Sequence, residues 1–298
     1  MLEQGTLWQK TLDSTERALQ AGTLLPIATR SRIIHDRGVD FLVRIVSSLS
    51  RKSEDKKESN PFLPYEESMF VADISDTHVC LLNKFNVIDH HLLIVTRSFE
   101  DQESLLTLQD FEAMGICMAE FDGLAFYNGG EIAGASQQHK HLQMIPLPMS
   151  DRTPKVPIEP LFASAGFKDE LGVVGDLPFL HSFARLDWSS LRVSPNASAS
   201  LLKLYLKMLS AVGLNSPFES RNRRQSGPYN FLFTREWMLL VPRRNEFFES
   251  ISVNALGFAG ALLVRNEQEM QVLEEKGCMS ALKTTSLPVD GSLNMGVQ

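Results

Sequence analysis

The chain has 298 residues, 43% of them hydrophobic and 22% charged, so it contains enough apolar surface for a large core. Its net charge of −7 argues against general binding to nucleic acid or to anionic membranes, because both favour basic surfaces. The three cysteines are widely spaced and form no Cys-x-x-Cys pair, which argues against a disulfide framework or a cysteine zinc site and predicts a cytoplasmic protein.

The N-terminal half combines amphipathic helices with short strands. Residues 1–20 carry scattered charges and predict neither a signal peptide nor a membrane span, while Leu7–Leu19 has the spacing of an amphipathic helix. Thr107 and Asp110 resemble a capping box that opens a helix to about Glu120. Strands are predicted over Phe41–Val46, Phe70–Ile74, His78–Leu82, His91–Thr96, Leu124–Asn128 and His139–Ile145.

Two stretches lack clear periodicity. Residues 51–60 are almost all polar and predict an exposed loop, and Met149–Pro178, rich in Pro and Gly, predicts an extended connection. The elements predicted after it are a helix over Ser198–Val212, strands over Tyr229–Thr234, Trp237–Pro242 and Ala261–Val264, a helix from Asn266 to Gly277, and a loose tail from Lys283. Because strands and helices do not alternate regularly, we expect an α+β fold: an antiparallel sheet with helices on one face, completed by the C-terminal strands.

The segment GASQQHKHLQ at 134–143 is the most informative part of the chain. Its end alternates polar and apolar residues, so His139, His141 and Gln143 project from one face of a strand. Alternate residues lie roughly 6.5 Å apart, a spacing at which two imidazoles and an amide can line a phosphoryl group. The glycine-containing turn before them is a usual source of backbone N–H groups for phosphate oxygens. The pattern predicts covalent catalysis at phosphorus by one histidine.

Two other interpretations of the histidine pair stay open at this point. Two neutral imidazoles on one face of a strand can chelate zinc, although Gln143, in the position of a third ligand, is a poor one. The pair can also be two ordinary histidines of a sheet. The turn before the pair and the glutamine after it favour phosphoryl chemistry.

Other segments of the chain share one resemblance. They are NPFLPY at 60–65, LLNKFNV and HHLLIVT within 81–96, FYNGG at 126–130, PYNFLFTREWMLLVPRR at 228–244 and NALGFAGALLVR at 254–265. Together with the histidine segment, and in this order, they resemble the diadenosine tetraphosphate phosphorylases, also called ATP adenylyltransferases. These enzymes belong to the histidine-triad and hexose-1-phosphate uridylyltransferase superfamily.

The resemblance implies a fold and a reaction. The fold is a histidine-triad-like antiparallel sheet with His-x-His-x-Gln on an internal strand, in a catalytic part over 1–150 and a C-terminal part over 151–298 that completes the nucleotide site. The reaction is the reversible phosphorolysis of diadenosine tetraphosphate by phosphate to ADP and ATP. His141 would attack the α-phosphorus and form an adenylyl-histidine, which phosphate then resolves.

The resemblance also implies roles for individual residues. Gln143 would donate to a phosphoryl oxygen, and His139 would assist as a third catalytic residue. Gly134, Ala135, Ser136 and Gln137 would hold the neighbouring phosphates. Further nucleotide contacts would fall on Lys52, Asn83, Lys84, Asn128, Asn254, Ala255, Leu256 and Arg265. No metal ligand and no covalently bound cofactor are expected; Mg²⁺ enters only as a companion of the polyphosphate. The expected partners are small nucleotides, and the expected state is a monomer.

Glutamine at 143 bears on the choice among relatives. The histidine-triad hydrolases place a third histidine there, and a glutamine cannot shuttle a proton, which suits transfer to an ionised acceptor such as phosphate. Two alternatives stay open: a related nucleotidyltransferase acting on adenosine phosphosulfate, and a non-catalytic nucleotide-binding protein. An intact His141 argues against the second, because binding alone requires no nucleophile.

Overall fold

A ten-stranded antiparallel sheet forms the centre of the computed structural model, which describes residues 2–46, 60–191, 194, 196–214 and 223–289. Its strands, in spatial order, are β3 (Phe70–Asp73), β4 (His78–Leu82), β5 (Leu92–Thr96), β7 (His141–Pro146), β6 (Gly123–Gly129), β11 (Tyr229–Phe233), β12 (Trp237–Pro242), β10 (Ser182–Arg185), β9 (Leu171–Val174) and β8 (Ala165–Lys168). The α+β class, the antiparallel sheet and the internal position of the histidine strand are therefore confirmed.

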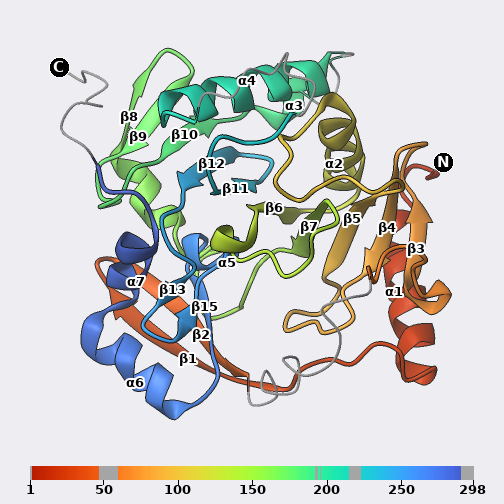
Figure 1. Cartoon of the computed structure of the whole chain (residues 1–298), viewed down its shortest axis with the longest axis horizontal. Helices are drawn as coiled ribbons and strands as arrows, with labels where there is room; N and C mark the ends of the chain where they lie inside the picture. Colours follow the sequence, from red (N-terminus) through yellow and green to blue (C-terminus); the bar gives the residue numbers. More distant parts are fainter. Residues whose placement is uncertain (1, 47–59, 192–193, 195, 215–222, 290–298) are drawn as a thin grey trace.

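The two faces of this large sheet are covered differently (Figure 1). On the helix face, which bears Leu142 and Met144, lie α1 (Leu7–Gln20), α2 (Leu108–Glu120) and α4 (Ala197–Ala211), with the short α3 (Trp188–Leu191) beside them. Tyr205 of α4 packs against Phe111 of α2 and Phe231 of the sheet, with ring centroids 5.5 and 5.4 Å apart. This continuous apolar cluster buries the stripe of each helix.

The opposite face, here called the site face because it bears His141 and Gln143, is covered by a second, smaller sheet. That sheet has the order β1 (Thr29–Asp36), β2 (Val39–Val46) and β15 (Ala261–Val264), and β15 pairs with β2 in parallel. Around it lie α5 (Ala255–Phe258), α6 (Glu267–Lys276), α7 (Cys278–Thr285) and the hairpin β13 (Phe247–Phe248) and β14 (Ile251–Ser252). Their apolar residues join those of the large sheet in one core cluster.

Several local predictions hold. The first helix is present as α1, and Thr107 and Asp110 form the predicted capping box: each side chain accepts a hydrogen bond from the other residue's backbone N–H. The strand over Phe41–Val46 lies within β2, and the C-terminal strands β11 and β12 join the large sheet. Residues 51–59 of the predicted loop, which include Lys52, lie outside the described residues.

Other predictions are wrong. Met149–Pro178 is not an extended connection: it contains a 3₁₀ helix (Glu159–Ser164) and the edge strands β8 and β9. The segment predicted as a loose tail from Lys283 is ordered over its described part: α7 runs to Thr285, and Ser286 forms a β-bridge with Arg243. Helices lie on both faces of the sheet, and β15 joins β2 instead of the large sheet. The predicted division of the chain into two parts near residue 150 stays a prediction. One strand from each part, β6 and β11, pair with each other in the large sheet.

Candidate active site

Two of the predicted catalytic side chains, those of His141 and Gln143, lie in the middle of the site face on β7, which begins at His141 and not at His139 as predicted. In the register of the sheet, His141 is paired with Val95 and Gln143 with Leu93 of β5, and Gln143 is also opposite Phe126 of β6. Leu142 and Met144 point to the helix face, as the alternation predicts. His139 lies before the strand and forms a single bridge with Asp101.

His141 is held in one orientation and is only 4% exposed. Its Nδ1 lies 2.8 Å from the carbonyl oxygen of His139. A carbonyl can only accept, so Nδ1 carries the hydrogen and Nε2 carries the lone pair of the neutral ring. Burial lowers the pKa of His141 to about 4, against the opposing effect of the His139 carbonyl. The imidazole is therefore neutral near pH 7 and held in one orientation, as a nucleophile would have to be.

His139 uses both ring nitrogens within the protein. Its Nε2 donates to the carbonyl oxygen of Thr96 at 2.8 Å, and its Nδ1 accepts from the Asn60 side chain at 3.0 Å. Phe62 contacts both histidine rings, with centroids 5.3 Å from that of His141 and 5.6 Å from that of His139. These contacts fix the His139 side chain. The carbonyl of the same residue accepts the hydrogen bond that orients the ring of His141.

The turn before β7 and the start of α5 meet beside the histidine. Gly134 has φ +88°, and a Cβ placed on it would come 2.7 Å from the Cβ of Asn254, so glycine is required here. Asn254 caps α5 by accepting from the N–H of Leu256. Asn128 accepts from the N–H of Ala255 at 2.9 Å. The turn at Gly134 therefore adjoins Asn254 at the start of α5, and Ser136, two residues later, is exposed.

Gln102 connects this turn region to the histidine strand. Its Nε2 donates to the backbone carbonyls of Asn128 and His141, at 2.9 and 3.2 Å, and its Oε1 accepts from the N–H of His141 at 2.8 Å. The Gln102 side chain thus makes hydrogen bonds that the backbones of β6 and β7 would otherwise make with each other at Asn128 and His141. Sequence reasoning did not find Gln102, because nothing in its polar surroundings marks it as buried.

Two of the predicted cationic contacts, Lys84 and Arg265, are bound to acidic side chains. Lys84 is exposed and lies 3.0 Å from Glu66, and the guanidinium of Arg265 donates to Glu269 and to the carbonyl of Ser250. Their roles as nucleotide contacts stay predictions.

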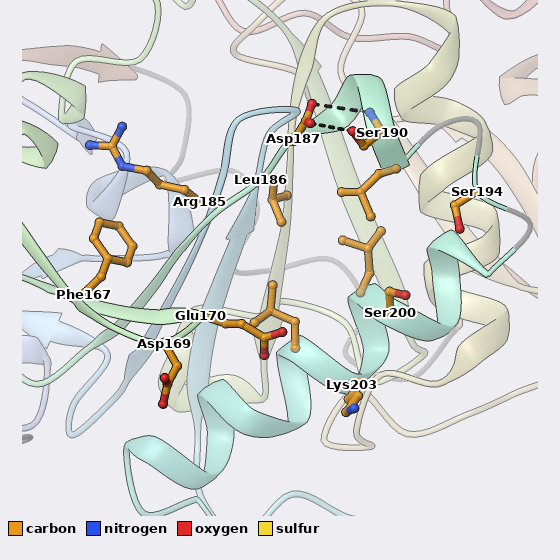
Figure 2. A pocket seen from close by; sticks show the side chains of 13 residues that line it. Phe167, Asp169, Glu170, Arg185, Leu186, Asp187, Ser190, Ser194, Ser200 and Lys203 are labelled. Carbon is orange, nitrogen blue, oxygen red and sulfur yellow. Dashed lines mark hydrogen bonds between the residues drawn. The ribbon is translucent and has the colours of Figure 1, made fainter.

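A separate cavity of about 640 Å³ lies at the other end of the large sheet, between β8–β10 and α4 (Figure 2). Phe167, Arg185, Asp187 and Lys203 are among its lining residues. None of the described residues predicted for the nucleotide site lines it. The described residues predicted for the site therefore lie outside this cavity.

Among the described residues, no three His, Cys, Asp or Glu side chains gather as metal ligands. Over the same residues, no helix is both long and apolar enough to cross a membrane.

Sequence comparison decides the family. Residues 1–164 match the Ap4A phosphorylase N-terminal domain, and residues 175–288 match the ATP adenylyltransferase C-terminal domain. The chain belongs to the Ap4A phosphorylase family. The resemblance predicted from the sequence segments is confirmed, and so is the prediction of a nucleotidyltransferase enzyme.

Similar proteins of the Ap4A phosphorylase family are known in yeast. Diadenosine 5',5'''-P1,P4-tetraphosphate phosphorylase 2 of Saccharomyces cerevisiae is 27% identical over 92% of this chain and 92% of its own length. The crystal structure of yeast Ap4A phosphorylase Apa2 in complex with Ap4A superposes with a TM-score of 0.79, at 26% identity over 97% of this chain and 99% of Apa2. The complex of Apa2 with AMP gives 0.78 at the same identity and coverage.

Proposed function

We infer that this protein catalyses the reversible phosphorolysis of diadenosine tetraphosphate by inorganic phosphate, giving ADP and ATP. The observation that carries the proposal is the state of His141: a buried, neutral ring whose Nδ1 donates to the His139 carbonyl, which leaves the lone pair on Nε2. Such a ring can attack phosphorus without first losing a proton.

The reaction proceeds in two displacements. Nε2 of His141 attacks the α-phosphorus of the dinucleotide; the N–P bond forms, the bond to the bridging oxygen breaks, and ATP leaves. An oxygen of phosphate then attacks the same phosphorus, the N–P bond breaks, and ADP is released. Gln143 donates to a non-bridging oxygen as negative charge develops there. Yeast Apa2, which has been crystallised with Ap4A and with AMP, supports both the substrate and the adenylyl group.

The remaining site residues bind the substrate. The backbone of Gly134–Gln137 and the hydroxyl of Ser136 hold phosphate oxygens. Asn128 holds the start of α5 against β6, the strand next to the histidine strand. Further nucleotide contacts come from Lys52, Asn83, Lys84 and Arg265. Mg²⁺ accompanies the polyphosphate as part of the substrate. The protein acts as a monomer in the cytoplasm. Its three free cysteines are suited to that reducing compartment.

The test is to incubate the protein with diadenosine tetraphosphate, with and without phosphate, and to separate the products. ADP plus ATP, formed only with phosphate, is the expected result, whereas AMP plus ATP would identify a hydrolase. Intact-mass spectrometry of an acid-free quench should detect an adenylyl adduct on the parent and none on His141→Ala. No turnover at all, with nucleotide binding intact, would favour the non-catalytic alternative.

A further inference from the structure

The side chains of Asn83, His91 and Gln143 come from three segments of the chain and are joined by hydrogen bonds in that order. Asn83 follows β4, His91 precedes β5, and the backbone N–H of Asn83 donates to the carbonyl of His91 at 2.9 Å, so the two residues extend the β4–β5 pairing. The Asn83 amide nitrogen lies 3.1 Å from Nδ1 of His91, and Nε2 of His91 lies 2.9 Å from Oε1 of Gln143. His91 is 8% exposed, and its ring packs on Phe126.

The chemistry of the groups gives this row one direction. The amide oxygen of Gln143 can only accept, so Nε2 of His91 carries a hydrogen. The amide nitrogen of Asn83 can only donate, so Nδ1 of His91 accepts from it. The orientation of Asn83 is set independently, because its Oδ1 accepts from the backbone N–H of Phe85 at 3.3 Å. The donor end of the Gln143 amide is consequently turned away from His91.

We propose that His91 is a positioning residue for the adenylyl transfer: supported by Asn83, it holds the Gln143 amide so that its NH₂ group, and not its oxygen, faces the reacting phosphate. This inference rests on the proposed function. If the Gln143 amide rotated by half a turn, its oxygen would face the negatively charged phosphoryl oxygen in place of its NH₂ group. A donor that is not held in place therefore stabilises the transition state less. Sheet packing alone needs only an aromatic ring at this position, which phenylalanine would supply.

The decisive variants are His91→Phe and His91→Gln, each made in the parent and in Gln143→Ala. His91→Phe keeps a ring against Phe126 but removes the donor, so we expect kcat to fall about tenfold while KM for diadenosine tetraphosphate stays within about twofold. His91→Gln restores an N–H near the position of Nε2, and kcat should return to within about threefold of the parent. In the Gln143→Ala background, His91→Phe should cause no further loss, because the side chain it orients is gone.

A matched control is His181→Phe, which removes another buried histidine from the far part of the sheet. His181 accepts from the N–H of Val174 and is 4% exposed, so its loss should lower the melting temperature without changing kcat at a temperature where the variant is folded. If His91→Phe lowers kcat equally in both backgrounds, or does not lower it in the parent, the positioning role of His91 is wrong while the proposed function stands. A parent that forms no ADP and ATP would instead overturn the proposed function, and the role of His91 with it.

Discussion

Lys140 and His141 are neighbours in the chain, and both are buried, but they lie in opposite kinds of environment. On the helix face, the Lys140 ammonium group lies 2.6 Å from Asp110 and 3.2 Å from Glu100 and also donates to the carbonyl of Leu105. Asp110 accepts from His78 as well. On the site face, His141 is neutral, and one ring nitrogen is bound to a carbonyl.

The difference follows from the cost of burying charge. Burial would by itself raise the pKa of Asp110, but the charge of Lys140 and the contacts of His78 outweigh it and hold that pKa well below its usual value. A charged cluster of this kind is stable only when its members are partnered. A nucleophile needs the opposite, a lone pair kept for the substrate, and burial supplies this by keeping the imidazole neutral. The four predictions below test this contrast.

Removing the proposed nucleophile should have the largest effect. We expect His141→Ala to lower turnover by on the order of 10⁴-fold or more, about 5.5 kcal/mol of barrier, because the covalent route is lost. Nucleotide binding should survive, since other groups hold the phosphates. The measurement is phosphorolysis alongside equilibrium binding of the dinucleotide. His139→Ala should be less damaging, and near-normal phosphorolysis by His141→Ala would show that the nucleophile is another residue.

Breaking the charged cluster should reduce stability and spare the chemistry. Lys140→Met leaves Asp110 buried without its cation, so we expect about 3–5 kcal/mol of lost unfolding free energy, with kcat of the folded protein within a few-fold of the parent. Urea denaturation and steady-state kinetics measure the two quantities. The double variant Lys140→Met with Asp110→Asn should recover part of the loss. A single variant as stable as the parent would contradict the importance of the pair.

Changing Gln143 should separate transition-state binding from the exclusion of water. Gln143→Ala removes a donor to the developing charge and should lower turnover roughly 10²–10³-fold, about 2.7–4 kcal/mol. Gln143→His restores a donor and adds a proton carrier, so it should regain turnover while releasing a larger share of AMP. The AMP-to-ADP ratio at fixed phosphate is the measurement. An unchanged ratio in an active Gln143→His protein would mean that the pocket walls alone exclude water.

The neutral state of His141 should also appear in the pH dependence of stability. A histidine in the unfolded chain has a pKa near 6.5, and in the folded protein burial lowers the pKa of His141 to about 4. The unfolded state therefore binds more protons as the pH falls from 6.5 towards 4, and the folded state is destabilised by on the order of 2 kcal/mol at pH 5. Urea midpoints at pH 7.5 and 5 should differ less in His141→Ala than in the parent. Equal differences would contradict the lowered pKa.

Local sequence patterns predicted much of what surrounds the site. The two-residue period placed His141 and Gln143 on one face of β7 and Leu142 and Met144 on the other, and the Thr107–Asp110 spacing predicted the cap of α2. These features depend on neighbours within a few residues, so the sequence carries them directly. The strands β8 and β9 were missed because short segments with glycine have little periodicity and form only by pairing with each other and with β10.

By itself, therefore, the sequence determined the family, the sheet class and the face on which the side chains proposed for catalysis lie. The tertiary structure decided the rest: which nitrogen of His141 holds the lone pair, which way the Gln143 amide points, and how Gln102 joins β6 to β7. Each of these depends on hydrogen-bond partners far away in the chain. Their directions come from the geometry in which donors and acceptors meet, which no local pattern of residues contains.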